Sequence, residues 1–224
     1  MSLRTLKNAT RKEIGNKLNV LDNVQIKQQS DQTANTLSTF PPFQKAQNIA
    51  VYLNLPNKEL HTDKIITNCL NSNKKVYLPR IELLNTFNDY KNFPNQKSCL
   101  HFLSINNQFE IDNLQLRGKY KIREPNYHIN NSNDLLLNNE KLDLILLPGV
   151  AFSNNCMRLG HGAGFYDDFI KRYREKYNEI PLLVGIGLPD QLIDDHKLLH
   201  IEDHDEPLDF VIIADHIYSS NKQK

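Results

Sequence analysis

The sequence predicts an α/β fold: a single three-layer domain with a mostly parallel, Rossmann-like central sheet flanked by helices. The first observation is the run of Leu and Ile in the stretch LDLILLPG, Leu142–Gly149, which Pro148 and Gly149 close. Continuous apolar runs of this length are typical of strands buried on both faces. The second observation is the order strand, helix, strand over residues 49–78, which is typical of parallel strands joined by a crossover helix.

Two helices are expected before this unit. Apolar residues recur at helical spacing near the N-terminus, at Leu3, Leu6, Ile14, Leu18 and Leu21. A second helix is expected over Val24–Leu37, and Pro41-Pro42 ends that region because proline cannot continue a helix. Pro79 ends the unit that follows. Its strand, helix and strand are Ile49–Leu53, Leu60–Leu70 and Val76–Leu78.

The domain is expected to span residues 1–224, with a less regular insertion around 82–140. Within the insertion, Leu100–Ile105 is predicted as an edge strand and the asparagine-rich stretch Asn130–Asn139 as a surface loop. Two more strands follow, at Leu182–Ile186 and Phe210–Ile213. The sheet is therefore expected to have about five core strands.

Composition excludes some classes of partner. Lys and Arg total 27 against 26 Asp and Glu, so no net field attracts nucleic acid or an anionic membrane. No apolar run approaches the roughly 20 residues that span a bilayer. Cys69, Cys99 and Cys156 are widely spaced and cannot all pair, which favours a reducing compartment. We expect a cytoplasmic monomer that binds neither nucleic acid nor membrane.

Three alternating glycines, Gly160, Gly162 and Gly164, precede an amphipathic helix that carries Phe169 and Tyr173 on one side. Glycine has no Cβ, so its backbone N–H groups can approach a ligand closely, and the following helix start favours an anion. The pattern is neither a Walker A motif nor the dinucleotide-binding G-x-G-x-x-G. We interpret the loop as a phosphate site, and an ordinary tight connection is the alternative.

Three charged residues near these elements each have two interpretations. Arg158 could clamp phosphate or be a solvated loop charge. Asp167 could complement the helix dipole or, beside phosphates, bind Mg²⁺. Glu59 follows a strand at the point where open parallel sheets bind ligands, and it could equally be a charge at a helix start.

Three histidines four residues apart, His196, His200 and His204, would share one face of a helix and could bind zinc there. Acidic residues surround them. Pro207 disfavours a helix through His204, and no further Cys or His cluster completes the ligand set. Zinc is therefore the less favoured interpretation.

The run Leu142–Tyr173, LDLILLPGVAFSNNCMRLGHGAGFYDDFIKRY, resembles the signature of the 5-formyltetrahydrofolate cyclo-ligase family. The resemblance covers nearly the whole chain, because shorter pieces also match in the same order. These pieces are Leu3-Arg4, YLNLPNKELHT with Glu59, YLPR ending at Arg80, Glu124-Pro125, and HDEPLD over His204–Asp209.

The resemblance implies an enzyme that uses ATP to convert 5-formyltetrahydrofolate to 5,10-methenyltetrahydrofolate, with release of ADP and phosphate. ATP is then the co-substrate and Mg²⁺ the expected metal. In the family's mechanism the formyl oxygen is phosphorylated, and N10 closes the ring as phosphate leaves. Such a reaction needs positioning and charge neutralisation more than covalent help from the protein.

The resemblance also implies roles for individual residues. The catalytic set is Glu59, Arg158, His161 and Tyr166. The nucleotide-binding set is Arg4, Arg158, Leu159, Gly160, His161, Gly162, Ala163, Gly164, Phe165 and Tyr166. The substrate-binding set is Leu53, Glu59, His161, Phe165 and Tyr166. The metal ligands are Asp167 and Asp205.

The chain departs from the family pattern at a few positions. His161 and Ala163 stand where some members carry Arg and Lys, so less positive charge is available for phosphoryl transfer. Phe165 replaces a common Tyr and loses one hydroxyl contact. Some members also carry a basic residue ahead of the position of Arg4, and three residues could take its place here: Lys7, Arg11 and Lys12.

Two other functions stay open at this stage. With fewer cations in the loop, the chain could be a non-catalytic protein that binds reduced folate or nucleotide. A sugar-phosphate or thioester enzyme would also suit an α/β architecture, because a fold does not fix the chemistry.

Overall fold

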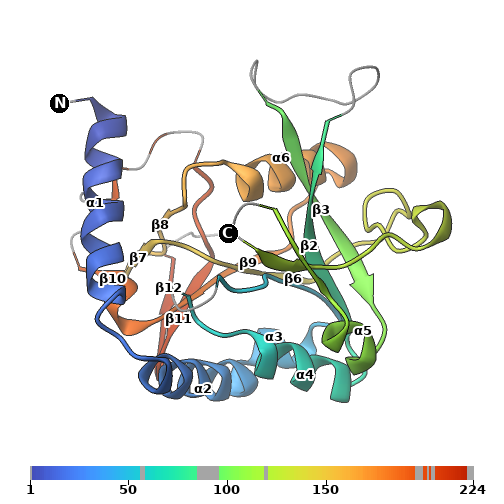
Figure 1. Ribbon diagram of the computed structural model, residues 1–224, viewed down its shortest axis with the longest axis horizontal. Coiled ribbons are helices and arrows are strands. Elements are labelled where there is room, and N and C mark those ends of the chain that lie inside the picture. The colour runs from blue at the N-terminus through green and yellow to red at the C-terminus, as the bar shows by residue number, and fades with distance from the viewer. Residues whose placement is uncertain are drawn as a thin grey trace.

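The computed structural model describes residues 2–55, 59–84, 96–118, 121–194, 199–200, 202 and 205–220. Seven strands form one central sheet in the order β12-β11-β9-β6-β1-β2-β3 (Figure 1). The strands are β1 (Asn48–Val51), β2 (Lys75–Leu83), β3 (Ser98–Ile105), β6 (Leu144–Leu147), β9 (Leu182–Gly187), β11 (Phe210–Ile213) and β12 (His216–Ser219). The five inner strands run parallel, and the edge strands β3 and β12 run antiparallel to their neighbours. The predicted mostly parallel sheet is confirmed.

Helices cover both faces of this sheet (Figure 1). On one face lie α2 (Asn23–Thr39), α3 (Pro41–Lys45) and α4 (Asp63–Asn71), and on the other lies α6 (Phe165–Tyr177). At one end, α1 (Leu3–Leu18) stands beside a small sheet of β7 (Ala151–Ser153), β8 (Arg158–Leu159) and β10 (Leu192–Ile193). None of the described helices is both long enough and apolar enough to cross a bilayer.

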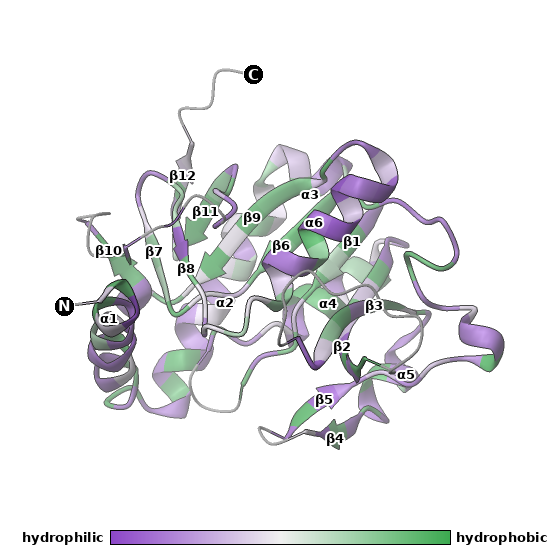
Figure 2. Ribbon diagram, turned by 90° about the horizontal axis from the view of Figure 1, so that it is seen from above, coloured by the Kyte–Doolittle hydropathy of each residue, from purple (hydrophilic) through white to green (hydrophobic). Residues whose placement is uncertain are grey.

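Successive side chains of the inner strands point alternately into two hydrophobic cores, one on each face of the sheet. Ile49 and Val51 of β1 pack with residues of α2 and α4, whereas Ala50 packs on the side of α6. All four residues of β6 are buried. Figure 2 shows the apolar colour concentrated on these inner strands. A strand covered by helices on both faces needs apolar residues at every position, which explains the continuous run in the sequence.

Two proline sites differ from the sequence prediction. Pro41 and Pro42 follow the end of α2 as expected, but they also begin the short helix α3, because the first turn of a helix needs no N–H partner there. The strand β2 continues through Pro79 instead of ending before it. Among the described residues, β1 pairs with β2 only as far as Tyr77, so β2 beyond this point behaves as an edge strand and tolerates proline.

The stretch predicted as a less regular insertion contributes the edge strand β3 to the central sheet, as predicted for Leu100–Ile105. It also holds short elements that the sequence did not indicate. These are α5 (Gln108–Asp112), the antiparallel pair β4 (Gln115–Arg117) and β5 (Ile122–Glu124), and the 3₁₀ turn η1 (Ile129–Asn131).

The prediction of a surface loop over Asn130–Asn139 is wrong at its centre. Asn133, Asp134 and Leu135 are buried, and the Leu135 N–H donates to the Phe102 carbonyl of β3 at 2.9 Å. The segment therefore covers part of the open backbone edge of β3. A polar composition conceals this role, because the contacts are made mainly by the backbone and by one leucine.

The chain leaves the middle of the sheet in two opposite directions. From β1 it continues to β2 on one side, and from β6, the other neighbour of β1, it continues to β9 on the far side. The carboxyl ends of β1 and β6 thus flank a topological switch point. In open α/β sheets this is the place where loops separate and leave a crevice for a ligand.

Candidate functional site

Glu59 follows β1 and lies at the switch point. Its side chain is only 6% exposed, and its Oε2 accepts a hydrogen bond from the Leu55 N–H at 2.7 Å. Nearby, the Thr62 hydroxyl donates to the Tyr52 carbonyl at 2.8 Å and ties the start of α4 to the end of β1. The Glu59 carboxylate is therefore held inside the fold, three positions before the N-cap Thr62 of α4 and outside the first turn of that helix.

The glycine loop lies between the β7–β8 hairpin and α6. Gly162 has φ +95° and Gly164 has φ +69°, a left-handed backbone that other L-residues rarely adopt. Gly164 is also the N-cap of α6, so the loop leads directly into the first N–H groups of that helix. At least two of the three glycines are therefore required by the path of the backbone.

The two loops meet through one polar contact. His161 Nε2 lies 2.9 Å from Glu59 Oε1, although the two residues are 102 positions apart in the chain. The Glu59 side chain is buried, whereas the His161 side chain is 51% exposed. The pair therefore joins an interior carboxylate to the surface of the crevice, and a ligand there could contact both residues.

Two tyrosines surround this pair. Burial, followed by the charge of Glu59, raises the pKa of both Tyr52 and Tyr166, so both phenols stay protonated, and the Tyr52 hydroxyl donates to the Leu60 carbonyl at 3.3 Å. The ring of Tyr166 lies 6.3 Å from the ring of Phe102 on β3. The sequence pattern does not single out Tyr52, because at the end of an apolar strand a tyrosine looks like an ordinary core residue.

Arg158 is buried at the base of the glycine loop. Its Nη2 donates to Asp167 Oδ1 at 2.8 Å, its Nη1 donates to the Pro148 carbonyl at 3.3 Å, and its guanidinium lies 5.9 Å from the centre of the Tyr166 ring. Its Nε–H has no hydrogen-bond partner within the described part of the chain. The interpretation of Arg158 as a solvated loop charge is therefore wrong.

Arg11 of α1 supports the same loop from the other side. Its Nε donates to the Gly160 carbonyl at 2.9 Å, and a Cβ placed on Gly162 would lie 3.3 Å from its Nη2. Burial lowers the pKa of Arg11, and the charge of Asp205 opposes that shift. Arg4 and Lys12 on the same helix are exposed, whereas Arg11 is half-buried. Arg11 therefore holds the glycine loop in place.

The two predicted metal ligands have different partners. Asp167 pairs with Arg158, as described above, whereas Asp205 accepts from Lys7 Nζ at 2.8 Å. Lys7 also donates to Glu202 at 2.7 Å. Burial lowers the pKa of Lys7, but the hydrogen bonds to Asp205 and Glu202 outweigh this and raise it. Among the described residues, no group of three or more His, Cys, Asp or Glu side chains is arranged to hold a metal.

The remaining predicted site residues lie at varying depth. Leu53 and Leu159 are buried in the core. Phe165, the first residue of α6, is half-buried against the core on that face of the sheet, and Ala163 of the glycine loop is exposed. His200 is half-buried. His196 and His204, on which the zinc interpretation depended, lie outside the described residues.

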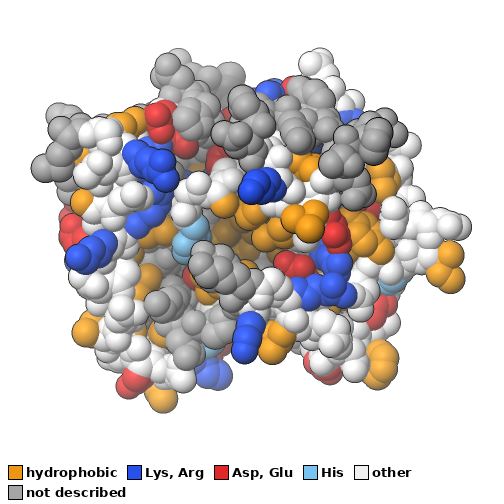
Figure 3. All heavy atoms as spheres, turned by 45° about the horizontal axis from the view of Figure 1, so that its top comes forward, with side chains coloured by type: hydrophobic (Ala, Val, Ile, Leu, Met, Phe, Trp, Pro, Cys, Tyr) orange, Lys and Arg blue, Asp and Glu red, His pale blue; other side chains and the backbone are white. Residues whose placement is uncertain are grey.

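The space-filling view of this side of the molecule shows a recess with a hydrophobic floor (Figure 3). A histidine side chain and both acidic and basic side chains are visible around it. This combination of an apolar floor and a few polar groups is typical of a small-molecule site.

Comparison with known proteins agrees with these observations. A model of the 5-formyltetrahydrofolate cyclo-ligase family matches residues 4–214. The chain is 29% identical over 211 residues to the 5-formyltetrahydrofolate cyclo-ligase of Saccharomyces cerevisiae, covering 93% of this chain and 95% of the relative. It is 29% identical over 194 residues to the Escherichia coli protein of the same name, covering 87% and 92%.

Two solved structures share the fold. A 5,10-methenyltetrahydrofolate synthetase from Aquifex aeolicus has a TM-score of 0.69 at 21% sequence identity, covering 98% of this chain and 95% of that one. A synthetase of the same name from Mycoplasma pneumoniae has a TM-score of 0.58 at 20% identity, covering 94% and 99%. Because the family model extends over nearly the whole chain, this protein belongs to the 5-formyltetrahydrofolate cyclo-ligase family.

Proposed function

We propose that this protein uses ATP to convert 5-formyltetrahydrofolate to 5,10-methenyltetrahydrofolate, releasing ADP and phosphate. The formyl oxygen attacks the γ-phosphorus of ATP, and ADP leaves. N10 of the folate then attacks the activated formyl carbon, the ring closes, and phosphate departs. The protein's task is to hold the reacting groups together and to balance the charge that moves between them.

The observation that carries this proposal is the meeting of two loops at the switch point. The connection from β6 to α6, which contains the β7–β8 hairpin and the glycine loop, offers backbone N–H groups and a buried arginine, which suit a polyphosphate. The loop after β1 offers a buried carboxylate, which suits the N–H groups of a pterin. His161 and Glu59 join the two loops at 2.9 Å, so a phosphate and a pterin bound there would be neighbours.

In this proposal the triphosphate of ATP lies along the segment Arg158–Tyr166 and the start of α6. The left-handed turns at Gly162 and Gly164 leave backbone N–H groups open to phosphate oxygens. Arg158 supplies positive charge and has an Nε–H without a protein partner among the described residues. Arg4 reaches the nucleotide from the first turn of α1.

The folate lies beside the phosphates. Glu59 accepts hydrogen bonds from the pterin, and the apolar side chains of Leu53 and Phe165 line its pocket. Tyr166 stays protonated because burial and the charge of Glu59 raise its pKa, so it can donate to the formyl or phosphoryl oxygen. His161 stands between the pterin and the phosphates, where its imidazole donates a hydrogen bond to the transferred group.

Asp167 and Asp205 are the residues proposed to hold Mg²⁺. Mg²⁺ usually takes one or two carboxylates together with phosphate oxygens, so these two carboxylates would hold the ion jointly with the phosphates of ATP. When bound, the ion neutralises charge on the phosphates. Each carboxylate now pairs with a cation, Arg158 or Lys7, and that cation would have to release or share it.

One assay tests the proposed reaction. The purified protein is mixed with 5-formyltetrahydrofolate and MgATP, and the absorbance of the methenyl product is followed over time. We expect product only when ATP is present, and ADP formed in equal amount. Folded protein that makes no product would contradict the proposal, and calorimetric binding of the folate without ATP consumption would identify a non-catalytic binder instead.

We place the reaction in a monomer in the cytoplasm. Cys69, Cys99 and Cys156 are all buried and none forms a disulfide, which suits a reducing compartment. Analytical ultracentrifugation of the purified protein tests the monomer, since a dimer would sediment with twice the mass. Localisation of a fluorescent fusion in the source cells tests the compartment.

A further inference from the structure

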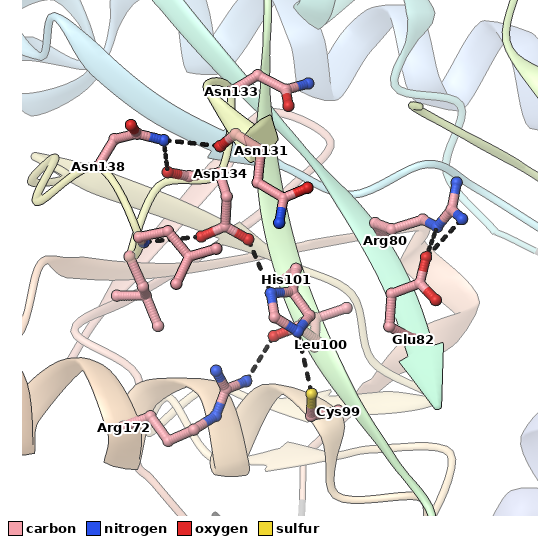
Figure 4. Close-up of polar contacts among 12 residues, drawn as sticks. Arg80, Glu82, Cys99, Leu100, His101, Asn131, Asn133, Asp134, Asn138 and Arg172 are labelled. Carbon is pink, nitrogen blue, oxygen red and sulfur yellow. Dashed lines mark hydrogen bonds and ion pairs between the residues drawn. The ribbon is translucent and has the colours of Figure 1, made fainter. Parts of the chain in front are cut away.

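A second chemical cluster lies on the edge strand β3, apart from the residues assigned above (Figure 4). Cys99 and His101 are two positions apart in β3 and so share one face of the strand. Cys99 Sγ lies 3.1 Å from His101 Nε2, and Asp134 Oδ2 lies 2.8 Å from His101 Nδ1. A thiol, an imidazole and a carboxylate are therefore joined in a line, the order found in activated cysteine nucleophiles.

Asp134, the carboxylate of this Cys99–His101–Asp134 line, is held rigidly. Asp134 is 1% exposed, and its other oxygen, Oδ1, accepts from the Leu137 N–H at 2.9 Å. The segment that carries it is fixed to β3 by backbone hydrogen bonds, including that from Leu135 N–H to the Phe102 carbonyl. Asp134 can therefore fix the tautomer and orientation of His101.

The charged neighbours on β2 do not disrupt this line. In the β2–β3 ladder, Arg80 lies opposite His101 and Glu82 lies opposite Cys99. Arg80 and Glu82 pair with each other at 2.7 Å, and Arg80 also donates to the Pro125 carbonyl at 2.8 Å. The ring of Tyr127 packs edge-on against His101, with centres 6.1 Å apart. The Asp134 carboxylate thus remains the direct charged partner of the imidazole.

His101 is cationic at neutral pH in these surroundings. Burial lowers its pKa, but the hydrogen bonds to Asp134 and Cys99 outweigh burial and raise the pKa to about 9. An imidazolium donates Nδ1–H to the carboxylate and Nε2–H to the sulfur. The second of these is the hydrogen bond that a thiolate accepts.

The sulfur lies just below the surface. Cys99 is 7% exposed, the His101 side chain is 22% exposed, and the Glu82 side chain is 34% exposed. Cys99 is thus the most exposed of the three cysteines. Cys69 and Cys156, by contrast, are fully buried, and burial raises the pKa of Cys69 to about 12.

We propose that Cys99 is a modification site, a nucleophilic thiol that His101 and Asp134 prepare for reaction with hydroperoxides and soft electrophiles. With a hydroperoxide, the deprotonated sulfur of Cys99 attacks the terminal peroxide oxygen and the O–O bond breaks. The leaving hydroxide or alkoxide takes the Nε2 proton of His101. Sulfur is oxidised by two electrons to a sulfenic acid, and the peroxide is reduced to water or an alcohol.

The first test compares the three cysteines within the native wild-type protein. The protein is treated with a small excess of iodoacetamide at neutral pH, and the alkylated fraction of each cysteine is followed by peptide mass spectrometry. We expect Cys99 to react at least tenfold faster than Cys69 and Cys156. Equal rates at the three positions would overturn the proposal.

The greater exposure of Cys99 could by itself make it react faster than the other cysteines. The substitution His101→Gln separates this effect from the effect of the imidazole. It keeps a polar side chain at the same half-buried position but removes the imidazole. We expect the Cys99 rate to fall about tenfold while the slow rates of Cys69 and Cys156 stay unchanged. An unchanged Cys99 rate would overturn the role of His101, and His101→Asn provides a second variant if the first does not fold.

The oxidation step has its own readout. Hydrogen peroxide is added to the native protein with dimedone, which labels sulfenic acids, and the labelled residue is mapped. We expect the label on Cys99, a loss of the label in Cys99→Ser, and about tenfold less label in His101→Gln. Label spread evenly over the three cysteines, or none on Cys99, would contradict the proposed reaction.

Discussion

The candidate site depends on one buried carboxylate, that of Glu59. Removing an ionised carboxylate from water is costly unless its oxygens are hydrogen-bonded. Here Leu55 N–H serves one oxygen and His161 lies beside the other. Both partners belong to loops, so the fold supports this carboxylate with groups that a substrate can approach. Such a placement is more typical of a binding residue than of a core residue.

The substitution Glu59→Gln is expected to lower kcat/KM for the folate by about tenfold to a hundredfold. The amide keeps the shape but loses charge-assisted hydrogen bonds, each worth about 1.5–3 kcal/mol. Steady-state kinetics at saturating ATP measure the effect. Glu13→Gln is the control, because Glu13 is exposed on α1 and pairs only with Lys17 among the contacts described for it. Identical kinetics in both variants would remove Glu59 from the site.

His101 is expected to make stability depend on pH. Its pKa is about 9 in the folded protein, since hydrogen bonds to Asp134 and Cys99 outweigh burial, and its ordinary value is 6.5. The folded pKa is the higher one. The contribution of His101 to the unfolding free energy is therefore complete below about pH 6.5 and is lost as pH rises through about 9.

Urea unfolding at about pH 6 and about pH 9.5 measures this dependence. The wild type should lose about 1–3 kcal/mol more stability between these two pH values than His101→Gln does. The comparison within each protein cancels the direct cost of the substitution. Equal losses in the two proteins would mean that His101 is not charged in the folded state.

At the scale of elements, the sequence predicts those parts of the fold whose pattern is local. The continuous apolar run of β6 and the four-residue spacing of Phe165, Phe169 and Tyr173 in α6 each identify an element without help from the rest of the chain. The glycine loop is likewise predicted, because two of its glycines have backbone angles that only glycine adopts readily.

Features that depend on distant neighbours are not predicted. Pro79 is compatible with β2 only because β1 pairs no further along β2 in the described chain, and Asp134 is buried only because it lies along β3. Arg11 belongs to the site through its bond to the Gly160 carbonyl, 149 positions away in sequence. A local pattern carries no information about such partners.

Gly162→Ala is expected to weaken ATP binding more than it weakens the fold. The alanine would have to adopt φ +95°, which strains the loop, and its Cβ would lie 3.3 Å from Arg11 Nη2, so the guanidinium would also have to shift. We expect the KM for ATP to rise about tenfold. Gly15→Ala is the control: its Cβ meets no atom within 4 Å in α1, and it should stabilise the protein by about 1 kcal/mol. An unchanged KM for ATP in Gly162→Ala would show that the loop does not hold the nucleotide.

Arg11→Ala tests the link between α1 and the glycine loop. Without the bond from Nε to the Gly160 carbonyl, the loop loses its fastening, and we expect the KM for ATP to rise several-fold while the KM for the folate changes little. Lys12→Ala removes a neighbouring exposed cation and is the control for net charge. Equal effects in the two variants would indicate long-range electrostatics instead of positioning.

At the scale of the whole molecule, the topology brings the distant segments together. The strand order reverses between β1 and β6, so the loops after these two strands open the sheet at one edge. The N-terminal helix closes the same region. Arg11 of α1 binds the glycine loop, and Lys7 of α1 pairs with Glu202 and Asp205 from the segment after β10. Residues from both ends of the chain thus surround one crevice.

Hydrogen–deuterium exchange tests most directly whether both substrates bind in this crevice. The protein is measured alone, with 5-formyltetrahydrofolate, and with the folate plus a non-hydrolysable ATP analogue. We predict that the folate slows exchange in the segment that holds Glu59 and that the nucleotide adds protection over Gly160–Tyr166. Protection of α2 and α4, with these two segments unchanged, would contradict a shared site at the switch point.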